Sequence, residues 1–376
     1  MGRIIENAGK RICLIFPYIA DVHLTKDIGL IPYILQKYFG YESTIATNKQ
    51  GEYPSLDTFV KGIKLDFMDN TGDPARDIQN YIENNALNYD YICLYGVYDF
   101  YIKASEIYKK IRSDGKIYLK LDANMSWMNS IQLNQDVDSF LKRCDLISVE
   151  CKDIYVYLNK KWPYRVEYIP NGYYDFNESN RVEYKEKENI IMTAGRIGIH
   201  QKANEVLLEA FRLVSDKLPS WKLKIIGAVE EAFQVYLDDF LNKHPQILDK
   251  IIFTGQISDR RVMDMEYRKA KIFCLTSRWE GFPNVLPEAG KKGCFIISTD
   301  IEPARDITNN RKYGELFAVD NTSQLSDMFV KICNNEERLS EVCNGIQDYI
   351  QDSFDWIKIC RKLDILLSNV GGGDSV

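Results

Sequence analysis

Short apolar runs alternate with longer segments of helical period along nearly the whole chain, and this alternation constrains the fold more than any other feature. Apolar runs of this length, bounded by turn residues, are typical of strands that are buried on both faces of a parallel sheet. The segments between them are typical of crossover helices, so the predicted fold class is α/β. At 376 residues, the chain is long enough for two domains.

Two series of strands are predicted, and a polar stretch at Asp175 to Asn189 separates them. The first series comprises Arg11–Phe16, Glu42–Thr47, Tyr91–Tyr95, Lys116–Leu121 and Leu146–Val149; the second comprises Ile190–Ala194, Lys222–Ile226, Ile251–Thr254, Ile272–Leu275 and Phe295–Ser298. We therefore expect two Rossmann-like domains, at residues 1–175 and 190–350. Apolar residues recur with helical period near the end, so residues 351–376 are expected to form a C-terminal helix and a loose tail.

Composition excludes several other classes of protein. With 48 basic and 54 acidic residues, the net charge of −6 is too acidic for a general nucleic-acid binder. The nine cysteines form no C-x-x-C pair and there are three histidines, which predicts no zinc site and a reduced, cytosolic protein. The longest apolar run, Ile12 to Ala20, is too short to span a bilayer; it imitates a signal peptide, but a buried first strand is favoured. No G-x-G-x-x-G follows this strand, which disfavours an NAD enzyme.

The loop after the strand Ile190–Ala194 contains Gly195 and two cations, Arg196 and Lys202, before a helix that begins near Asn204. Ligands of open parallel sheets bind at the carboxyl ends of the strands. Backbone N–H groups and two positive side chains on one such loop would suit a diphosphate. Taken alone, the segment is equally compatible with two solvated surface cations.

A second candidate segment follows the strand Ile272–Leu275 and places seven residues between Glu280 and Glu288. Glu280 is expected in a loop and Glu288 on the first turn of a helix with Asn284 as its N-cap. A glycine at position 281 allows the backbone to approach a ligand closely. Unpaired N–H groups at residues 284–286 would favour an anion there, and a carboxylate would suit sugar hydroxyls.

These segments resemble the GT-B glycosyltransferases of family 4, a retaining family that uses nucleotide sugars. The matching motifs are Gly195-Arg196 with Lys202 ahead of Leu207-Leu-Glu-Ala-Phe211, Glu280-x7-Glu288 within E-G-F-P-x-V-x-x-E-A, and Ile169-Pro-Asn-Gly172. The resemblance implies two Rossmann-like domains that face each other across a cleft, with the C-terminal helix packing back on the first. This sequence departs from the family in the length of the Arg196–Lys202 loop, which is often one residue shorter, and at Ile301 to Ala304, where many members have a Gly-Gly turn.

The resemblance also implies roles for individual residues. Arg196 and Lys202 are similar to the pair that neutralises the donor diphosphate, and Glu288 is similar to the carboxylate that binds the ribose hydroxyls. Glu280 is expected to meet the donor sugar. The remaining donor contacts implied are Gly195, Gly227, a base pocket at Gly255, Gln256 and Ile257, and a sugar and phosphate support at Gly281, Phe282, Asn284, Val285 and Leu286.

In the family the first domain binds the acceptor, and here the sequence offers fewer candidates. Asp122 follows a predicted strand, where its carboxylate would orient an acceptor hydroxyl; the alternative is an ordinary turn or cap residue. Gly29 would let the backbone approach the diphosphate, or it is simply a helix-entry glycine. Tyr98 and Tyr101 either stack on sugars or pack in the core.

Acceptors of this family are often lipid-linked, and basic residues gather in one helix and strand of the first half. They are Lys103, Lys109, Lys110, Arg112, Lys116 and Lys120. This cluster predicts electrostatic contact with anionic lipid or, equally, a solvated helix face.

The predicted function is a retaining glycosyltransferase that moves a sugar from a nucleotide-diphosphate donor to a saccharide or lipid-linked saccharide acceptor, in glycan or surface polysaccharide biosynthesis. We expect a UDP-sugar rather than a GDP-sugar, no metal and no other cofactor, since prepositioned cations and N–H groups stabilise a diphosphate leaving group. We expect a cytoplasmic protein. Any contact with lipid is expected to be peripheral, at the inner face of the membrane. The alternatives are a nucleotide-sugar epimerase or hydrolase of the same fold, and a catalytically silent partner-binding subunit.

Overall fold

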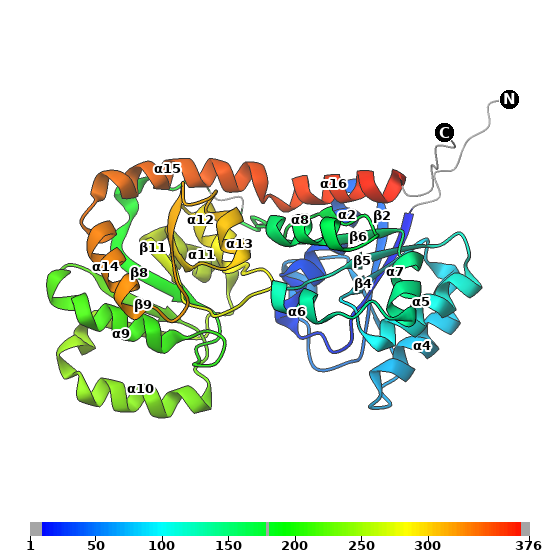
Figure 1. The fold of residues 1–376 in the computed structure, drawn as a ribbon, viewed down its shortest axis with the longest axis horizontal. Helices are drawn as coiled ribbons and strands as arrows, with labels where there is room; N and C mark the ends of the chain where they lie inside the picture. Colours follow the sequence, from blue (N-terminus) through cyan, green and yellow to red (C-terminus); the bar gives the residue numbers. More distant parts are fainter. Residues whose placement is uncertain (1–9, 178–179, 370–376) are drawn as a thin grey trace. The chain divides into compact units, whose positions relative to one another are not determined.

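The computed structural model describes residues 10–177 and 180–369, and the chain divides into two compact units (Figure 1). Unit 1 comprises the chain up to Tyr174 together with the segment from Trp356 onward, and unit 2 comprises Asp175–Asp355. The chain therefore leaves unit 1, forms all of unit 2 and returns to unit 1. The expected tail after residue 369 lies outside the described residues.

Unit 1 is built on a seven-stranded sheet with the order β3-β2-β1-β4-β5-β6-β7, in which every pairing is parallel. Its strands are β1 (Lys10–Ile15), β2 (Tyr41–Thr47), β3 (Lys64–Phe67), β4 (Tyr91–Tyr95), β5 (Lys116–Lys120), β6 (Leu146–Val149) and β7 (Glu167–Tyr168). The five predicted strands agree with β1, β2, β4, β5 and β6 to within one residue at each end. The edge strands β3 and β7 are additional, because neither contains an apolar run.

Helices cover both faces of this sheet: α2 and α16 lie on one side, and α4 and α5 lie on the other (Figure 1). The helices of unit 1 are α1 (Asp21–Leu24), α2 (Asp27–Phe39), α3 (Ser55–Thr58), α4 (Pro74–Asn85), α5 (Asp99–Ile111), α6 (Met125–Ser130), α7 (Gln135–Arg143), α8 (Lys152–Lys161) and α16 (Trp356–Asn369). The C-terminal helix α16 packs on α2, and its Asp364 accepts hydrogen bonds from Lys10 and Tyr41 at 2.7 and 3.0 Å. The prediction that this helix returns to the first unit is confirmed.

Unit 2 contains a second parallel sheet, with six strands in the order β10-β9-β8-β11-β12-β13. Its strands are β8 (Glu188–Ala194), β9 (Lys222–Ile226), β10 (Ile251–Gly255), β11 (Ala270–Leu275), β12 (Phe295–Thr299) and β13 (Gly314–Phe317). The predicted strands agree with β8 to β12 to within two residues, and the short edge strand β13 is additional. The helices of unit 2 are α9 (Asn204–Val214), α10 (Glu231–Lys243), α11 (Arg260–Lys269), α12 (Val285–Lys291), α13 (Glu302–Ile307), α14 (Thr322–Cys333) and α15 (Glu336–Ser353).

Both sheets reverse their strand order once, and in sheets of this kind ligands bind beside the reversal at the carboxyl ends of the strands. The reversal lies between β1 and β4 in unit 1, and between β8 and β11 in unit 2. In unit 2 the two loops beside the reversal are those that follow β8 and β11. These are the two segments in which the sequence places its main candidate residues.

Candidate functional site

Three glycines follow or end three neighbouring strands of unit 2 and lie side by side at the carboxyl edge of the sheet. Gly195 follows β8, Gly227 follows β9 and Gly255 ends β10, with φ angles of 139°, 148° and 68°. The N–H of Gly195 donates to the Ile226 carbonyl, and the N–H of Gly227 donates to the Gly255 carbonyl, both at 2.9 Å. A Cβ atom at Gly227 would stand 1.6 Å from the Gly195 carbonyl oxygen, so no other residue fits there.

The turn after β10, which the family resemblance implies as the base pocket, is open. Gly255 and Gln256 are exposed and Ile257 is half-buried. The backbone at this edge of the sheet is thus accessible to a ligand.

The loop between β8 and α9 is closed by a pair of hydrogen bonds at its base. The Asn204 side chain accepts from the Gly198 N–H at 2.8 Å, and the Asn204 N–H donates to the Gly198 carbonyl at 3.1 Å. Ala203 adopts a left-handed φ of 47°, which turns the chain into the helix.

Lys202 and Glu280 form an ion pair that joins the two loops beside the strand reversal. Lys202 Nζ lies 2.6 Å from Glu280 Oε1, and 23% and 10% of the two side chains remain exposed. Gln201 Nε2 lies 3.4 Å from Glu280 Oε2, and Gln201 Oε1 accepts a hydrogen bond from Arg196 Nη2 at 2.9 Å. One chain of contacts therefore brings Arg196, Lys202 and Glu280 together.

Arg196 also pairs with a carboxylate that the sequence motifs do not include, that of Glu230. Its Nε atom lies 2.7 Å from Glu230 Oε1, and 58% of the Arg196 side chain is exposed. Both cations of the loop are thus paired with carboxylates.

Arg278 fixes the relative position of the two loops. Its N–H donates to the Gln201 carbonyl at 2.8 Å, and its Nη2 atom lies 2.7 Å from Glu205 Oε1. Beside it, the Thr276 hydroxyl donates to the Lys202 carbonyl at 2.8 Å. Arg278 therefore positions the loop between β8 and α9, which contains Arg196 and Lys202. The sequence signal that could have found it is its place three residues after the end of β11.

Glu288 lies in α12, and both of its carboxylate oxygens already accept hydrogen bonds. Arg260 Nη2 is 2.9 Å from Oε1, and the Tyr267 hydroxyl is 2.9 Å from Oε2. A carboxylate offers about four acceptor positions, so two remain for hydroxyl groups of a ligand. Arg260 and Tyr267, both from α11, hold the carboxylate in place and were not evident from the sequence.

The start of α12 differs from the prediction. Asn284 occupies the N-cap position, but its backbone angles are helical and its side chain makes no capping bond. Within the described chain its Oδ1 atom is buried with no hydrogen-bond partner. The Leu286 N–H donates to the Pro283 carbonyl at 2.9 Å, so it is not one of the unpaired donors that were expected. The reason is that the chain already turns at Pro283, one residue before the cap.

The other expected support residues lie in the same turn but are not equally accessible. Gly281 and Val285 are half-buried, whereas Phe282 is buried and its ring lies 6.2 Å from that of Phe354. Phe282 therefore contributes to the core of unit 2, and the backbone of the turn remains the part that can meet a ligand.

In unit 1, the carboxyl edge of the sheet contains a buried charge cluster of Asp27, Lys120 and Glu150. Lys120 Nζ lies 2.5 Å from Glu150 Oε1 and 3.1 Å from Asp27 Oδ2, and both Lys120 and Glu150 are fully buried. Burial opposes a charge on Lys120, but the carboxylates of Glu150 and Asp27 outweigh it and raise the pKa of the ammonium. The Lys120 ammonium therefore keeps its charge inside the protein.

Asp122 lies beside this cluster, directly after β5. Its Oδ1 atom is 4.0 Å from Lys120 Nζ, its N–H donates to Glu150 Oε1 at 3.3 Å, and its φ is 45°. Burial raises the pKa of Asp122 to about 7; Lys120 opposes this shift, while the charges of Asp27 and Glu150 add to it. Solvent reaches 47% of the side chain and screens these charges in part.

Two other predictions for unit 1 are modified by the structure. A Cβ atom at Gly29 would stand 2.0 Å from the Leu24 carbonyl oxygen, so the close packing of α1 on α2 explains this glycine, as the structural alternative proposed. Lys120 is buried and cannot belong to a basic surface. Lys109 and Lys116 both pair with Asp145, at 2.7 and 3.5 Å, which neutralises part of the remaining cluster.

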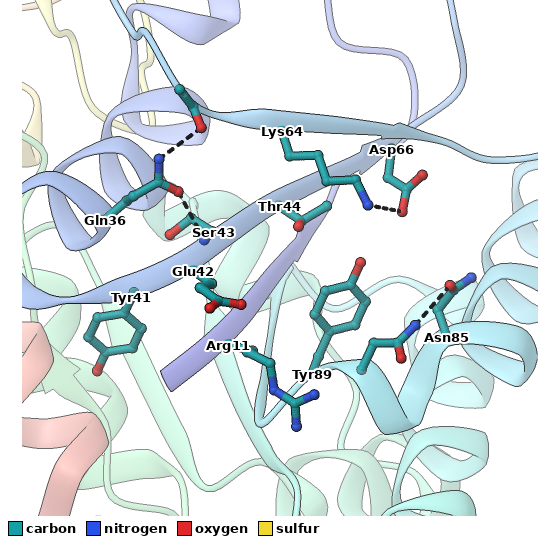
Figure 2. Close-up of a pocket in the computed structure, with 12 residues that line it drawn as sticks. Arg11, Gln36, Tyr41, Glu42, Ser43, Thr44, Lys64, Asp66, Asn85 and Tyr89 are labelled. Atoms are coloured by element: carbon teal, nitrogen blue, oxygen red, sulfur yellow. Dashed lines mark hydrogen bonds and ion pairs between the residues drawn. The ribbon is translucent and has the colours of Figure 1, made fainter. Parts of the chain in front are cut away.

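A pocket of about 530 Å³ lies elsewhere in unit 1, at the amino ends of its strands (Figure 2). Arg11 of β1, Thr44 of β2 and Lys64 of β3 line it, and Lys64 pairs with Asp66 across 3.3 Å. Because the strand reversals place ligands at the carboxyl ends, this pocket is separate from the candidate residues.

Among the described residues, no helix combines the length and the apolar character that a membrane span requires.

Comparison with known proteins finds a family model that matches most of unit 2. Residues 175–348, nearly all of unit 2, match the family model described as glycosyl transferases group 1. An N-acetyl-D-galactosaminyltransferase from Campylobacter jejuni that acts on an undecaprenol-linked glycan is 26% identical over 247 residues, which cover 62% of this chain and 66% of that protein. A phosphatidyl-myo-inositol mannosyltransferase from Mycobacterium tuberculosis is 23% identical over 212 residues, 54% of each chain. The matches thus span between half and two thirds of these relatives' lengths.

Solved structures resemble the whole chain. A glycosyltransferase from Rickettsia africae has a TM-score of 0.74 at 16% identity, covering 97% of this chain and all of the other. Anabaena HepE, solved in complex with UDP and glucose, has a TM-score of 0.72 at 14% identity, covering 96% of this chain and all of the other. At these identities the likeness establishes the fold.

Proposed function

We propose that this protein transfers a sugar from a nucleoside-diphosphate donor to a saccharide or lipid-linked saccharide acceptor. Two findings support the proposal: residues 175–348 match the family model of the group 1 glycosyltransferases, and the whole chain has the GT-B fold. The single observation that supports this most strongly is the contact chain from Arg196 through Gln201 to Glu280 and Lys202, at the strand reversal of unit 2. It gathers two cations and a carboxylate at the place where such sheets bind ligands.

The chemistry follows from the charge that develops when the donor breaks. Cleavage of the bond between the anomeric carbon and the diphosphate leaves negative charge on the β-phosphate. Arg196 and Lys202 offset that charge once the diphosphate has replaced their carboxylate partners. Glu280, freed from Lys202, accepts hydrogen bonds from hydroxyls of the donor sugar, and Glu288 accepts those of the ribose.

We propose a retaining transfer in which the acceptor attacks from the face that the diphosphate leaves, and the departing phosphate oxygen accepts the acceptor's proton. No side chain is assigned as a nucleophile. The donor we propose is a UDP-sugar, and the two cations make a metal unnecessary, so EDTA should leave the rate unchanged. A cytoplasmic location and peripheral membrane contact stay predictions, and vesicle pelleting at low and high salt tests the latter.

The decisive experiment starts from binding. The full chain is titrated with UDP- and GDP-sugars while its melting temperature is followed, because a ligand that binds the folded state raises it. Donors that raise the melting temperature are then tested for release of nucleoside diphosphate in the presence of saccharide acceptors. The anomeric configuration of the product is determined by NMR. If no nucleotide sugar raises the melting temperature, the proposal fails; release without acceptor supports the hydrolase alternative, and an inverted product contradicts the retaining mechanism.

Lys202→Ala tests the site. Removing one prepositioned charge of this kind lowers kcat by about 10²–10³-fold, while the melting temperature should change little because the side chain is partly exposed. The matched control is Lys243→Ala, which breaks the exposed 2.7 Å pair with Asp239 on α10 and should leave kcat unchanged. An unchanged kcat for Lys202→Ala at saturating donor rejects the assignment.

A further inference from the structure

Two exposed aromatic rings lie at the carboxyl edge of the unit 1 sheet, beside its strand reversal. Tyr98 follows β4 and is 44% exposed, and Trp127 lies in α6, which follows β5, and is 37% exposed. Their ring centroids are 5.7 Å apart and their planes are inclined by 34°. Exposed aromatic rings that touch each other form a small apolar surface, a feature that often marks a binding site.

The backbone fixes the Tyr98 ring in this position. Gly96, at the turn after β4, has a φ of 74°, and a Cβ atom there would lie 2.6 Å from the Tyr98 ring. The Gly96 N–H donates to the Lys120 carbonyl at 2.8 Å, which fastens the turn to β5. Phe100 stacks against the Tyr98 ring at 5.3 Å with an interplanar angle of 6°. The ring is therefore held in place by the turn below it and the ring beside it.

Trp127 is fixed by the start of its own helix. Asn124 is the N-cap of α6, and its side chain accepts a hydrogen bond from the Trp127 N–H at 2.8 Å. Asp122 comes two residues earlier, at the end of β5. Asp122 thus lies in the segment that joins β5 to the helix carrying Trp127. Burial, and to a smaller extent the Asp122 carboxylate, raise the pKa of the Tyr98 hydroxyl.

The neighbouring tyrosine shows that this exposure is selective. Tyr101, one turn further along α5, is buried and donates its hydroxyl hydrogen to the Ile15 carbonyl at 2.8 Å. Of the two tyrosines that the sequence singled out in this segment, Tyr101 packs in the core and Tyr98 faces solvent.

We propose that Tyr98 and Trp127 form a stacking platform for a pyranose ring of the acceptor, with Asp122 as hydrogen-bond partner for one of its hydroxyls. This inference rests on the proposed function and identifies the part of unit 1 that recognises the acceptor. A pyranose has an apolar C–H face and a rim of hydroxyl groups, which matches two aromatic faces beside one carboxyl group. Aromatic rings that are already held in place lose little conformational entropy on binding, so they suit the apolar face of a sugar.

The test uses methyl glycosides as probes: the α-glucoside, α-galactoside and α-mannoside and their N-acetylamino analogues. Saturation-transfer NMR on the full chain reports which ring protons contact the protein, and titration gives the Kd of each probe. At least one probe should bind the wild-type protein through its C–H face. Tyr98→Ala and Trp127→Ala should each raise that Kd by about threefold to tenfold, the contribution typical of aromatic contacts.

Three variants separate stacking from a structural effect. Tyr98→Phe keeps the ring and should bind as the wild type does, whereas Tyr98→Leu keeps apolar bulk without the ring and should bind as Tyr98→Ala does. Tyr38→Ala removes another exposed tyrosine, near the C-terminal end of α2, and should change nothing. Equal weakening by Tyr38→Ala, or full binding by Tyr98→Leu, overturns the proposal.

UDP titration, measured by calorimetry on the same samples, keeps the two proposals apart. If UDP binds but no methyl glycoside does, the platform is wrong and the proposed function survives. If neither UDP nor GDP binds, the proposed function fails and the platform with it. Binding of anionic phospholipid vesicles that is lost in Trp127→Ala, without any glycoside binding, also overturns the sugar platform.

Discussion

The carboxyl edges of the two sheets contain similar groups of charged residues but bury them differently. In unit 1, Lys120 and Glu150 are fully enclosed, together with Asp27. In unit 2, 23% of the Lys202 side chain and 58% of the Arg196 side chain are exposed, although Glu280, at 10%, is as buried as Asp27. A ligand can compete for charges that solvent still reaches, whereas enclosed charges remain bound to each other. The comparison therefore supports a structural role for the first cluster and the proposed binding role for the second.

The energetics of ion pairs support this distinction. Removing one partner of a buried pair leaves an uncompensated charge in the interior, at a cost of about 3–5 kcal/mol. An exposed pair contributes about 0–1 kcal/mol because solvent screens it. Substitution of Lys120 should therefore mainly lower stability, whereas substitution of Lys202 should mainly lower activity.

Lys120→Met should give the largest loss of stability. Without the ammonium, Glu150 and Asp27 are left as unpaired buried carboxylates, and the free energy of unfolding should fall by about 3–5 kcal/mol in urea titrations. Lys202→Met is the matched comparison and should lower it by less than Lys120→Met does, because the Lys202 side chain is partly in solvent. Adding Glu150→Gln to Lys120→Met should restore part of the loss. Equal losses in the two lysine variants would contradict the distinction.

Glu288→Gln should weaken nucleotide binding by an intermediate amount. A hydrogen bond to a charged group contributes about 1.5–3 kcal/mol, so the Kd should rise by about tenfold to a hundredfold. Since the predicted contact is with the ribose, the factor should be the same for UDP and for UMP in calorimetric titrations. Lys202→Ala should weaken UDP far more than UMP, because its partner is the diphosphate. The reverse pattern would exchange the two roles.

The sequence predicted the parts of the fold that depend on local pattern. Ten of the strands follow from apolar runs, and the strand ends that hold Arg196, Lys202 and Glu280 follow from recognisable motifs. The edge strand β3 reads Lys-Leu-Asp-Phe and gives no such signal, because it is covered only in part.

Contacts between distant segments could not be predicted in this way. Arg278 meets Glu205 across 73 residues, and Lys120 meets Asp27 and Glu150 only because β5 and β6 bring the segments together. The basic cluster assigned to the surface included Lys120 for the same reason: a charged residue at the end of a strand gives no indication that carboxylates from other segments will enclose it. The missing cap at Asn284 likewise depends on a turn at Pro283 that the pattern of residues does not specify.

Asp122→Asn tests the boundary between the two kinds of edge, because this carboxyl group adjoins the buried cluster and is still partly in solvent. Its pKa is raised from an ordinary value of 3.8 to about 7, so the folded protein binds a proton more tightly than the unfolded chain does. The contribution of this proton to stability is thus fully present below about pH 4 and is lost as the pH rises toward 7.

Asp122→Asn should remove this dependence, so the stability of the variant relative to the wild type should increase between pH 4 and pH 8. Because 47% of the side chain is exposed, we expect a gain of about 1 kcal/mol in urea unfolding rather than the full value of the shift. Asp239→Asn, on the exposed face of α10, should show no such trend. A difference between Asp122→Asn and wild type that stays constant with pH would mean that solvent, and not the buried cluster, governs this carboxyl group.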